Sequence, residues 1–211
     1  MACAHHQDST AKIDIDRRVA ALVPTEQPFA PPVAALPKPI AVGQWTLHKV
    51  VNAKGEPSLL TYKIVGEDGD AYWVEVADES YFGKKVTKML VSFGDRSNPS
   101  NMEIRSIKVK DSAGNVSEIQ ANMIPATRSS WQEAANLLVI AWQGLPREDV
   151  HVVAGNFAGC FRAPTSAQGG GTAWAHPIVP ITGLVRIVSS GQPSVMELIG
   201  FGDMGATSEI P

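Results

Sequence analysis

The stretch SLLTYKIVGEDGDAYWVEVA, residues 58–77, decides the fold class. Both of its ends are rich in Val, Leu, Tyr and Trp, a composition typical of strands. In the first run Leu60, Tyr62 and Ile64 alternate with polar neighbours, which indicates a strand with one buried face. The EDGD between the two runs is a turn sequence. The stretch therefore predicts two antiparallel strands joined as a hairpin.

Similar runs lie on both sides of this hairpin, and short turn sequences separate most of them. We expect about nine or ten strands in an antiparallel sheet. Glycines at 155 and 159 fall inside one long run and should bend it. The further strand-like runs are 44–51, 84–95, 101–111, 116–124, 148–164, 168–180, 183–190 and 194–202.

One segment of the domain has strong helical periodicity. The sequence TRSSWQEAANLLVIAWQG, residues 127–144, contains Ser130 and Glu133 at capping-box spacing. It predicts a helix near 129–143 that is apolar nearly all round and therefore buried. One stripe of this helix consists of Trp131, Ala135, Leu138 and Trp142. The expected fold is mainly β (α+β), with a curved antiparallel sheet, an incomplete β-barrel, wrapping one buried helix.

The first 42 residues differ in composition from the remainder. VPTEQPFAPPVAALPKPIAV, residues 23–42, carries six prolines, which remove backbone donors and favour extended conformations. Residues 1–42 are therefore predicted to form a disordered, Pro-rich flexible tether. The half-barrel domain is predicted to span 43–211.

Cysteine occurs only at Cys3 and Cys160. A small residue, Ala2, precedes Cys3, and a tether follows, so the start of the chain resembles the mature end of a bacterial lipoprotein. This resemblance implies lipidation of Cys3, attachment to a membrane through that lipid, and a place in the cell envelope. Ala4, where an Asp would favour retention at the inner membrane, points to the outer membrane and to its periplasmic side. The alternative is an ordinary free cysteine in a disordered cytoplasmic tail.

Charge and motifs exclude several classes of function. The formal net charge of −3 and the pI of about 5.9 argue against a nucleic-acid partner. His48, His151 and His176 have no partner spacing typical of a catalytic or metal site, and Cys160 lies in a strand where cysteine usually acts as a small hydrophobe. We therefore expect no catalytic residue, no metal site, no cofactor and no enzyme activity.

The tryptophans offer the sharpest hypothesis about a site. Three of them fall on predicted strands, and two on the predicted helix. They either form a single core or line an apolar pocket between sheet and helix that binds a hydrophobic ligand. Together with one leucine of the predicted helix, the residues of this hypothesis are Trp45, Trp73, Trp131, Leu138, Trp142 and Trp174.

The last sixty residues carry a resemblance to a family. One motif is Ala154, Gly155, Phe157 and Cys160, and the second comprises Trp174, Pro180, Gly183, Val185, Glu197, Leu198, Phe201, Gly202, Gly205 and Ala206. These patterns resemble bacterial envelope proteins with a lipoprotein-carrier (LolA/LolB-like) fold, an incomplete antiparallel barrel with an apolar concave face.

The resemblance implies a non-enzymatic lipoprotein that binds or carries an acyl chain or another hydrophobic ligand, such as a lipid or a lipoprotein. The alternative function is a structural or interaction subunit of an outer-membrane or periplasmic assembly, with envelope proteins as partners. The buried helix either yields to a ligand or stays in the core.

Overall fold

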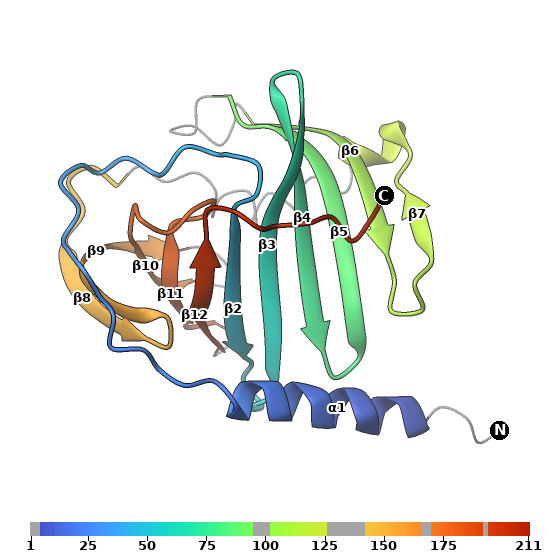
Figure 1. Ribbon diagram of the computed structural model, residues 1–211, viewed down its shortest axis with the longest axis horizontal. Helices are drawn as coiled ribbons and strands as arrows, with labels where there is room; N and C mark the ends of the chain where they lie inside the picture. The colour runs from blue at the N-terminus through green and yellow to red at the C-terminus, as the bar shows by residue number, and fades with distance from the viewer. Residues whose placement is uncertain (1–4, 95–101, 126–141, 166–169, 192–193) are drawn as a thin grey trace.

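The computed structural model describes residues 5–94, 102–125, 142–165, 170–191 and 194–211, with the backbone only for 5–11 and 13 (Figure 1). Its strands are β1 (Pro28–Phe29), β2 (Trp45–Val51), β3 (Pro57–Asp68), β4 (Ala71–Ser80), β5 (Gly83–Ser92), β6 (Glu103–Lys110), β7 (Val116–Glu118), β8 (Arg147–Val152), β9 (Gly155–Thr165), β10 (Gly171–Ala175), β11 (Leu184–Ser189) and β12 (Ser194–Gly202). The described helices are α1 (His5–Ala20) and a short 3-10 turn at Ala121–Met123.

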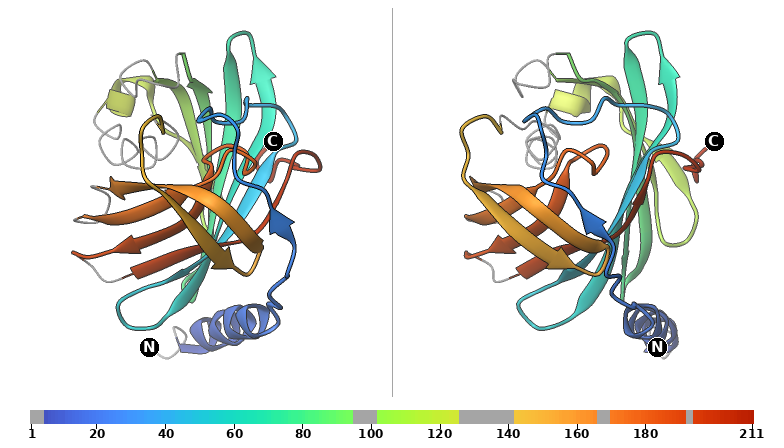
Figure 2. Two further views of the ribbon diagram at one scale, coloured as in Figure 1. Left: turned by 90° about the vertical axis from the view of Figure 1, so that its left-hand side faces the viewer. Right: turned by 60° about the vertical axis from the view of Figure 1, so that its left-hand side comes forward.

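All twelve strands belong to one curved sheet that does not close into a barrel (Figure 2). The order is β1-β9-β10-β11-β12-β2-β3-β4-β5-β6-β7, with β8 paired to β9 off this path. Two antiparallel meanders, β2–β7 and β8–β12, are joined side by side where β12 pairs with β2. The predicted fold class, a mainly β curved antiparallel half-barrel, is confirmed.

The strand count exceeds the expected nine or ten for two reasons. The run 148–164 is a hairpin of β8 and β9 and not one long bent strand. Gly155 opens β9 with a φ of +141°, and a Cβ there would lie 2.7 Å from the carbonyl oxygen of Gln27, so only glycine fits. The second additional strand is β1, which pairs with β9 in parallel and lies in the segment predicted to be a tether.

The concave side of the sheet carries the main hydrophobic core. Leu60, Tyr62 and Ile64 face this side, as their alternation predicts, together with Val74 of β4 and Met89 of β5. Burying such aliphatic and aromatic side chains is the main force that stabilises the curved sheet.

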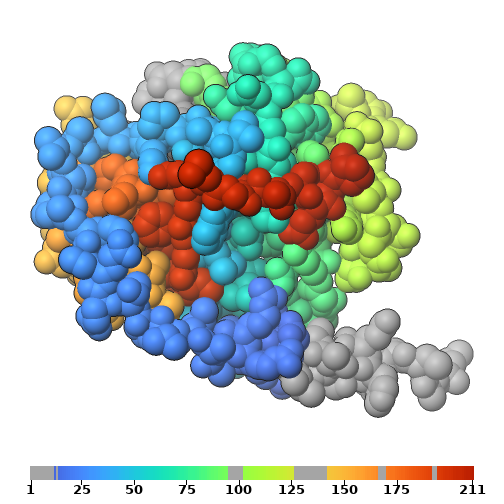
Figure 3. Space-filling view, in the orientation of Figure 1, coloured from blue at the N-terminus to red at the C-terminus, as the bar shows by residue number. Residues whose placement is uncertain are grey.

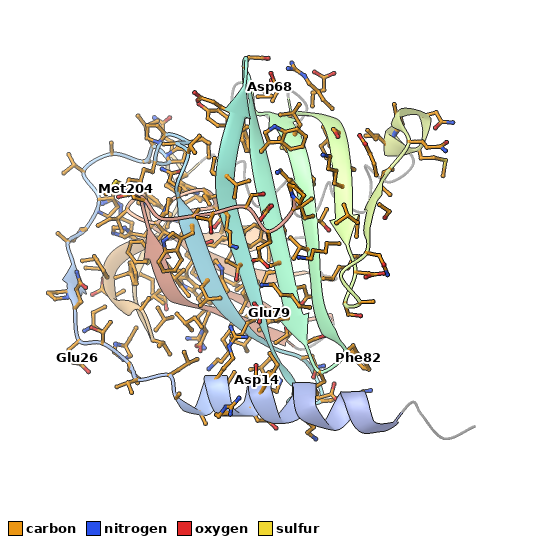
Figure 4. The ribbon with its side chains drawn as sticks, turned by 45° about the vertical axis from the view of Figure 1, so that its right-hand side comes forward. Asp14, Glu26, Asp68, Glu79, Phe82 and Met204 are labelled. Carbon is orange, nitrogen blue, oxygen red and sulfur yellow. The ribbon has the colours of Figure 1, made fainter. Side chains whose placement is uncertain are left out.

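The convex side is covered by two segments from opposite ends of the chain. Helix α1 lies across the ends of β3 and β4, and residues 203–211 cross the middle of the same strands (Figure 1). Arg18 of α1 pairs with Glu79 of β4 and lies 3.9 Å from Asp14; Figure 4 labels both carboxylates at this end of the sheet.

Within residues 12–42, part of the predicted tether contacts the domain. Ile15 of α1 is 3% exposed, and Asp16 accepts a hydrogen bond from the Tyr81 hydroxyl at 2.7 Å. Further along, the Phe29 ring stacks on Phe157 with centroids 4.4 Å apart. The prolines keep this segment extended, but its apolar side chains fix it to the domain by contacts distant in sequence, which composition does not reveal.

The predicted helix near 129–143 falls mostly on residues 126–141, outside the described part of the chain. Its last two residues, Trp142 and Gln143, are described and are not helical. Trp142 is nevertheless fully buried, as its place on the predicted apolar stripe requires.

We expect Phe29→Ala to lower the free energy of unfolding by about 2 kcal/mol, because it removes an aromatic stack from a partly buried site. Val33→Ala, four residues on at a fully exposed position, is the matched control and should change it little. Urea unfolding monitored by circular dichroism measures both. Equal and negligible effects would mean that residues 28–33 are a loose tether after all.

Candidate ligand-binding site

A cleft of about 570 Å³ lies where the proline-rich segment passes the start of β8. This volume falls in the range usual for small-molecule sites, roughly 300–1,000 Å³. One wall comes from residues 33–36 and the other from residues 143–147. The side chains that matter most are Val33, Ala35, Leu36, Leu145, Arg147 and Phe161.

One ring of an aromatic pair lines the cleft, and the other ring packs against it. Phe161 of β9 lines it, and Trp142 stacks on Phe161 with ring centroids 5.6 Å apart and planes 18° from parallel. Ala175 of β10 packs into the same cluster, with Ala35 and Leu145 against it. The cleft therefore rests on rigid strands, although its walls are irregular segments.

Arg147 ties the two walls together. Its guanidinium lies over the Phe161 ring, 4.8 Å from the centroid, and donates a hydrogen bond of 3.0 Å to the carbonyl oxygen of Pro32. The charge stays exposed at the rim. A cation at the mouth of a partly apolar cleft suits a ligand with an apolar body and an anionic or polar end.

The proline-rich segment is held in place a few residues before the cleft. His176 is buried, and its Nε2 lies 3.1 Å from the carbonyl oxygen of Ala30. The His176 Nδ1 accepts a hydrogen bond from the Ile178 backbone, so the proton sits on Nε2, which donates to Ala30. Burial lowers the pKa of His176, which keeps the ring neutral in this arrangement.

The structure does not bring the strand tryptophans to this cleft or to the concave core. Trp45 is paired with Lys63, and Trp73 shares a strand face with Glu75; both Lys63 and Glu75 contact residues 203–211 on the convex side. Trp174 lies opposite Arg186, in a polar ladder on that same outer face. Strand alternation indicates that a residue shares a face with its second neighbour, but not which face is inside.

Each of these tryptophans has a structural role on the outer face. The Trp45 indole packs on Gly200 and Gly202, where a Cβ on Gly202 would lie 2.6 Å from the Trp45 Nε1. Trp73 lies beneath the Lys88 ammonium, 5.3 Å from the ring centroid. The Trp174 Nε1 donates a 3.0 Å hydrogen bond to Glu148. Trp174 also packs against the buried cluster that contains Val150, Phe157 and Cys160. Trp45 and Trp73 therefore belong to a polar outer surface, whereas Trp174 has both polar partners and a buried apolar neighbourhood.

Of the described members of the predicted set, Trp142 comes nearest to the cleft: it does not line it but stacks on Phe161, which does. Trp131, Leu138 and the proposed lipidation residue Cys3 lie outside the described residues, so their roles stay predictions. Sequence reasoning missed Leu36, Arg147 and Phe161. Leu36 lies in the segment predicted to be a tether, and Phe161 in a strand noted only for its glycines.

Cys160 and His151 are two further titratable residues that the sequence singles out. Cys160 is fully buried, and burial raises the pKa of its thiol to about 12, which favours the neutral thiol at physiological pH. His151 is exposed and pairs with Asn156. Among the described residues, no group of three or more His, Cys, Asp and Glu side chains could hold a metal ion.

His48 is a buried polar residue on the concave side. Its Nε2 lies 3.2 Å from the carbonyl oxygen of Leu184, and its ring meets Tyr62 edge-on at 6.0 Å. Burial lowers the pKa of His48 to about 4, so the ring is neutral at physiological pH. It links β2 to the loop end of β11 across the interior.

The comparisons with known proteins add no relative. No protein-family model matches the chain, and neither the curated proteins nor the solved structures gave a match. Within the described residues, no helix has both the length and the apolar character needed to cross a membrane.

His48 predicts a stability loss in mild acid. The unfolded ring has its ordinary pKa near 6.5, whereas the folded ring binds a proton only near pH 4. Between these values the unfolded state takes up the proton first, so stability falls as pH decreases, by roughly 3 kcal/mol in all. Well above pH 6.5 the ring is neutral in both states and contributes no pH dependence.

The measurement is urea unfolding from about pH 7 to pH 4.5, for the unaltered protein and for His48→Asn. We expect the variant to lose much of the pH dependence, although His176 contributes in the same direction. His151→Asn, at an exposed position, is the control. An unchanged slope in His48→Asn would contradict the buried, neutral ring.

Proposed function

We propose that this protein is a non-enzymatic cell-envelope lipoprotein that binds an acyl-chain ligand in its half-barrel, with the cleft beside Phe161 as the entry. The observation that carries the proposal is the exposed apolar wall of the cleft. Leu36 is 73% exposed, Val33 is fully exposed, and both line the cleft together with Phe161, which stacks on the buried Trp142. Apolar side chains grouped at a concave site are better covered by a ligand than by water.

The chemistry of the cleft suits an amphiphile. Each methylene group of an acyl chain that leaves water for an apolar site contributes about 0.8 kcal/mol. The Arg147 guanidinium at the rim can pair with a carboxylate or phosphate head group. The open edge of the sheet, where β8 and β1 flank β9, leaves this side of the half-barrel without a further strand among the described residues.

Binding can be tested with an apolar fluorescent dye and palmitate as competitor. We expect the protein to bind the dye, palmitate to displace it, and Leu36→Asp to weaken binding about tenfold, because a charge replaces an apolar contact. Val23→Asp is the matched control, since Val23 is similarly exposed, at 80%, but does not line the cleft. The ligand proposal fails if no amphiphile binds, or if both variants bind alike.

The anchor is a separate part of the proposal. Cys3 would carry the lipid and hold the domain at the outer membrane, on the periplasmic side. Intact mass of the protein from its native locus, extracted in mild detergent, should show Cys3 as the first residue with acyl chains attached. A mass beginning at Met1 or Ala2 with a free thiol would instead place the protein outside the envelope.

A second candidate function is that of an interaction subunit in an envelope assembly. The edge strand β7 favours it, because β7 pairs only with β6 in the described sheet and leaves Val116 about half exposed. An unpaired edge can accept a strand from another chain. A releasable lipid in the intact-mass experiment would favour the carrier, and defined envelope proteins recovered by cross-linking would favour the subunit.

A further inference from the structure

Residues 203–211 lie on the convex face in the manner of a bound peptide. Figures 1 and 3 show this segment, in red, running across the strands in front of β3, β4 and β5. It does not extend the sheet as a further strand, and side chains of the sheet hold it. The surface beneath it is thus preformed by regular strands.

The carboxylate of Glu75 in β4 binds the backbone of this segment. The Glu75 carboxylate is 1% exposed and accepts backbone N–H bonds from Glu209, at 2.9 and 3.1 Å, and from Ile210, at 3.1 Å. It also accepts the hydroxyl proton of Ser208. A buried carboxylate is costly unless donors satisfy it, and the backbone N–H groups of this segment satisfy Glu75 while the segment covers it.

Lysine side chains bind the carboxylate, the hydroxyl and the carbonyl groups of the segment. Lys63 and Lys84 each lie 2.6 Å from the carboxylate of Glu209. Burial acts to raise the pKa of Glu209, but these two ammonium groups outweigh it and hold that pKa below its usual range. Lys88 donates to the Ser208 hydroxyl at 2.9 Å and to the carbonyl oxygen of Ile210 at 2.6 Å.

The next residue of the segment, Ile210, packs on apolar side chains of the sheet. Ile210 is fully buried against Ala77 of β4 and Val86 of β5. Main chain, hydroxyl, acid and aliphatic side chain of Ser208–Glu209–Ile210 are thus all recognised by named groups of the sheet. A different residue at any of these positions would lose one of these contacts.

The segment is joined to the sheet by an exposed linker. Asp203 and Met204 are exposed, and Gly205 has a φ of +98°, which glycine adopts without strain. Asp203 pairs with Lys38 at 2.6 Å, and the Ala206 N–H donates to the carbonyl oxygen of Gly43 at 2.9 Å, so these bonds must also break before the segment is released. Release of the segment would return Glu75 and the lysines to water on an outer surface. It would leave the concave core and the cleft, on the opposite side of the sheet, unchanged.

We propose that the convex face of β3–β6 is a peptide-binding site for an extended partner segment of the pattern hydroxyl–acid–aliphatic, and that residues 207–211 occupy this site and compete with the partner. Charge complementarity supports the choice, since lysines from β3, β5 and β6 surround the acidic position. The site is independent of the proposed acyl-chain cleft.

The direct test uses the chain without residues 207–211 and a labelled, end-capped peptide with the sequence of 205–211. We expect saturable binding by fluorescence anisotropy. Peptides with Lys at the Glu209 position or Asp at the Ile210 position should bind about tenfold more weakly or worse. Glu75→Gln in the shortened protein should have a similar effect, whereas Glu103→Gln, on β6 away from the segment, should not. A folded, shortened protein that shows no saturation, or equal binding of all the peptides, overturns the proposal.

Hydrogen exchange on the full chain keeps the proposal testable if the shortened protein does not fold. The amides of Glu209 and Ile210 should exchange about a hundredfold faster than those at the centre of β4, because the segment detaches locally. Exchange at the rate of the slowest core amides would mean that the site opens only when the whole domain unfolds. The segment would then be a permanent part of the fold, and the proposal would be wrong.

Discussion

The pairing of β12 with β2 is the interaction on which the rest of the structure depends. It joins strands about 150 residues apart in the sequence (Ser194–Gly202 and Trp45–Val51) and converts two separate meanders into one curved sheet. The register shifts between Leu198 and Gly200, and the glycines that follow leave room for the Trp45 indole on the outer face. This pairing also completes one apolar cluster, in which Leu184, Ile187 and Met196 pack with Val50 and Leu60 of the other meander. Since each meander forms from local hairpins, we expect this long-range closure to be the slow step of folding.

Once the two meanders are joined, apolar and charged side chains on the convex face still need to be covered. Segments near the two ends of the described chain cover them. Ala77 and Val86 are apolar, and Glu75 is a carboxylate among them; an open outer face would leave these groups in water. Helix α1 covers one end of β3 and β4 through Ile15, and the 203–211 segment covers the middle. The helix and the 203–211 segment are held on the sheet by different kinds of interaction. Ile15 contributes apolar burial, whereas Ser208–Ile210 is held mainly by charge-assisted hydrogen bonds, which are weakened by salt and by acid more than apolar contacts are.

How far the sequence predicts this structure depends on the range of the contacts. Alternation over 58–66 and 71–77 predicts β3, β4 and the buried faces of Leu60, Tyr62 and Ile64, because a hairpin is specified by neighbours. Periodicity does not reveal that Trp45, Trp73 and Trp174 point outward, since both faces of this sheet carry large side chains. The order of residues 5–42 is likewise hidden, because Ile15 and Phe29 find their partners far along the chain. Glycines at 155 and 159 suggested a bend, and only Gly155 marks a chain reversal.

The same distinction explains why no motif marks the cleft. Its walls are an irregular proline-rich segment and a turn, and its floor is a strand, so the three parts share no sequence spacing. They meet because Phe29, Ala30 and Pro32 are fixed in turn by Phe157, by His176 and by Arg147. The prolines assist by limiting the conformations that the segment must give up when it docks. Leu36 thereby lines the same cleft as Phe161 without being buried itself. Because the chain is already fixed a few residues earlier, covering the exposed Leu36 with a ligand would cost little further entropy, which supports the proposal that this edge of the half-barrel binds a ligand.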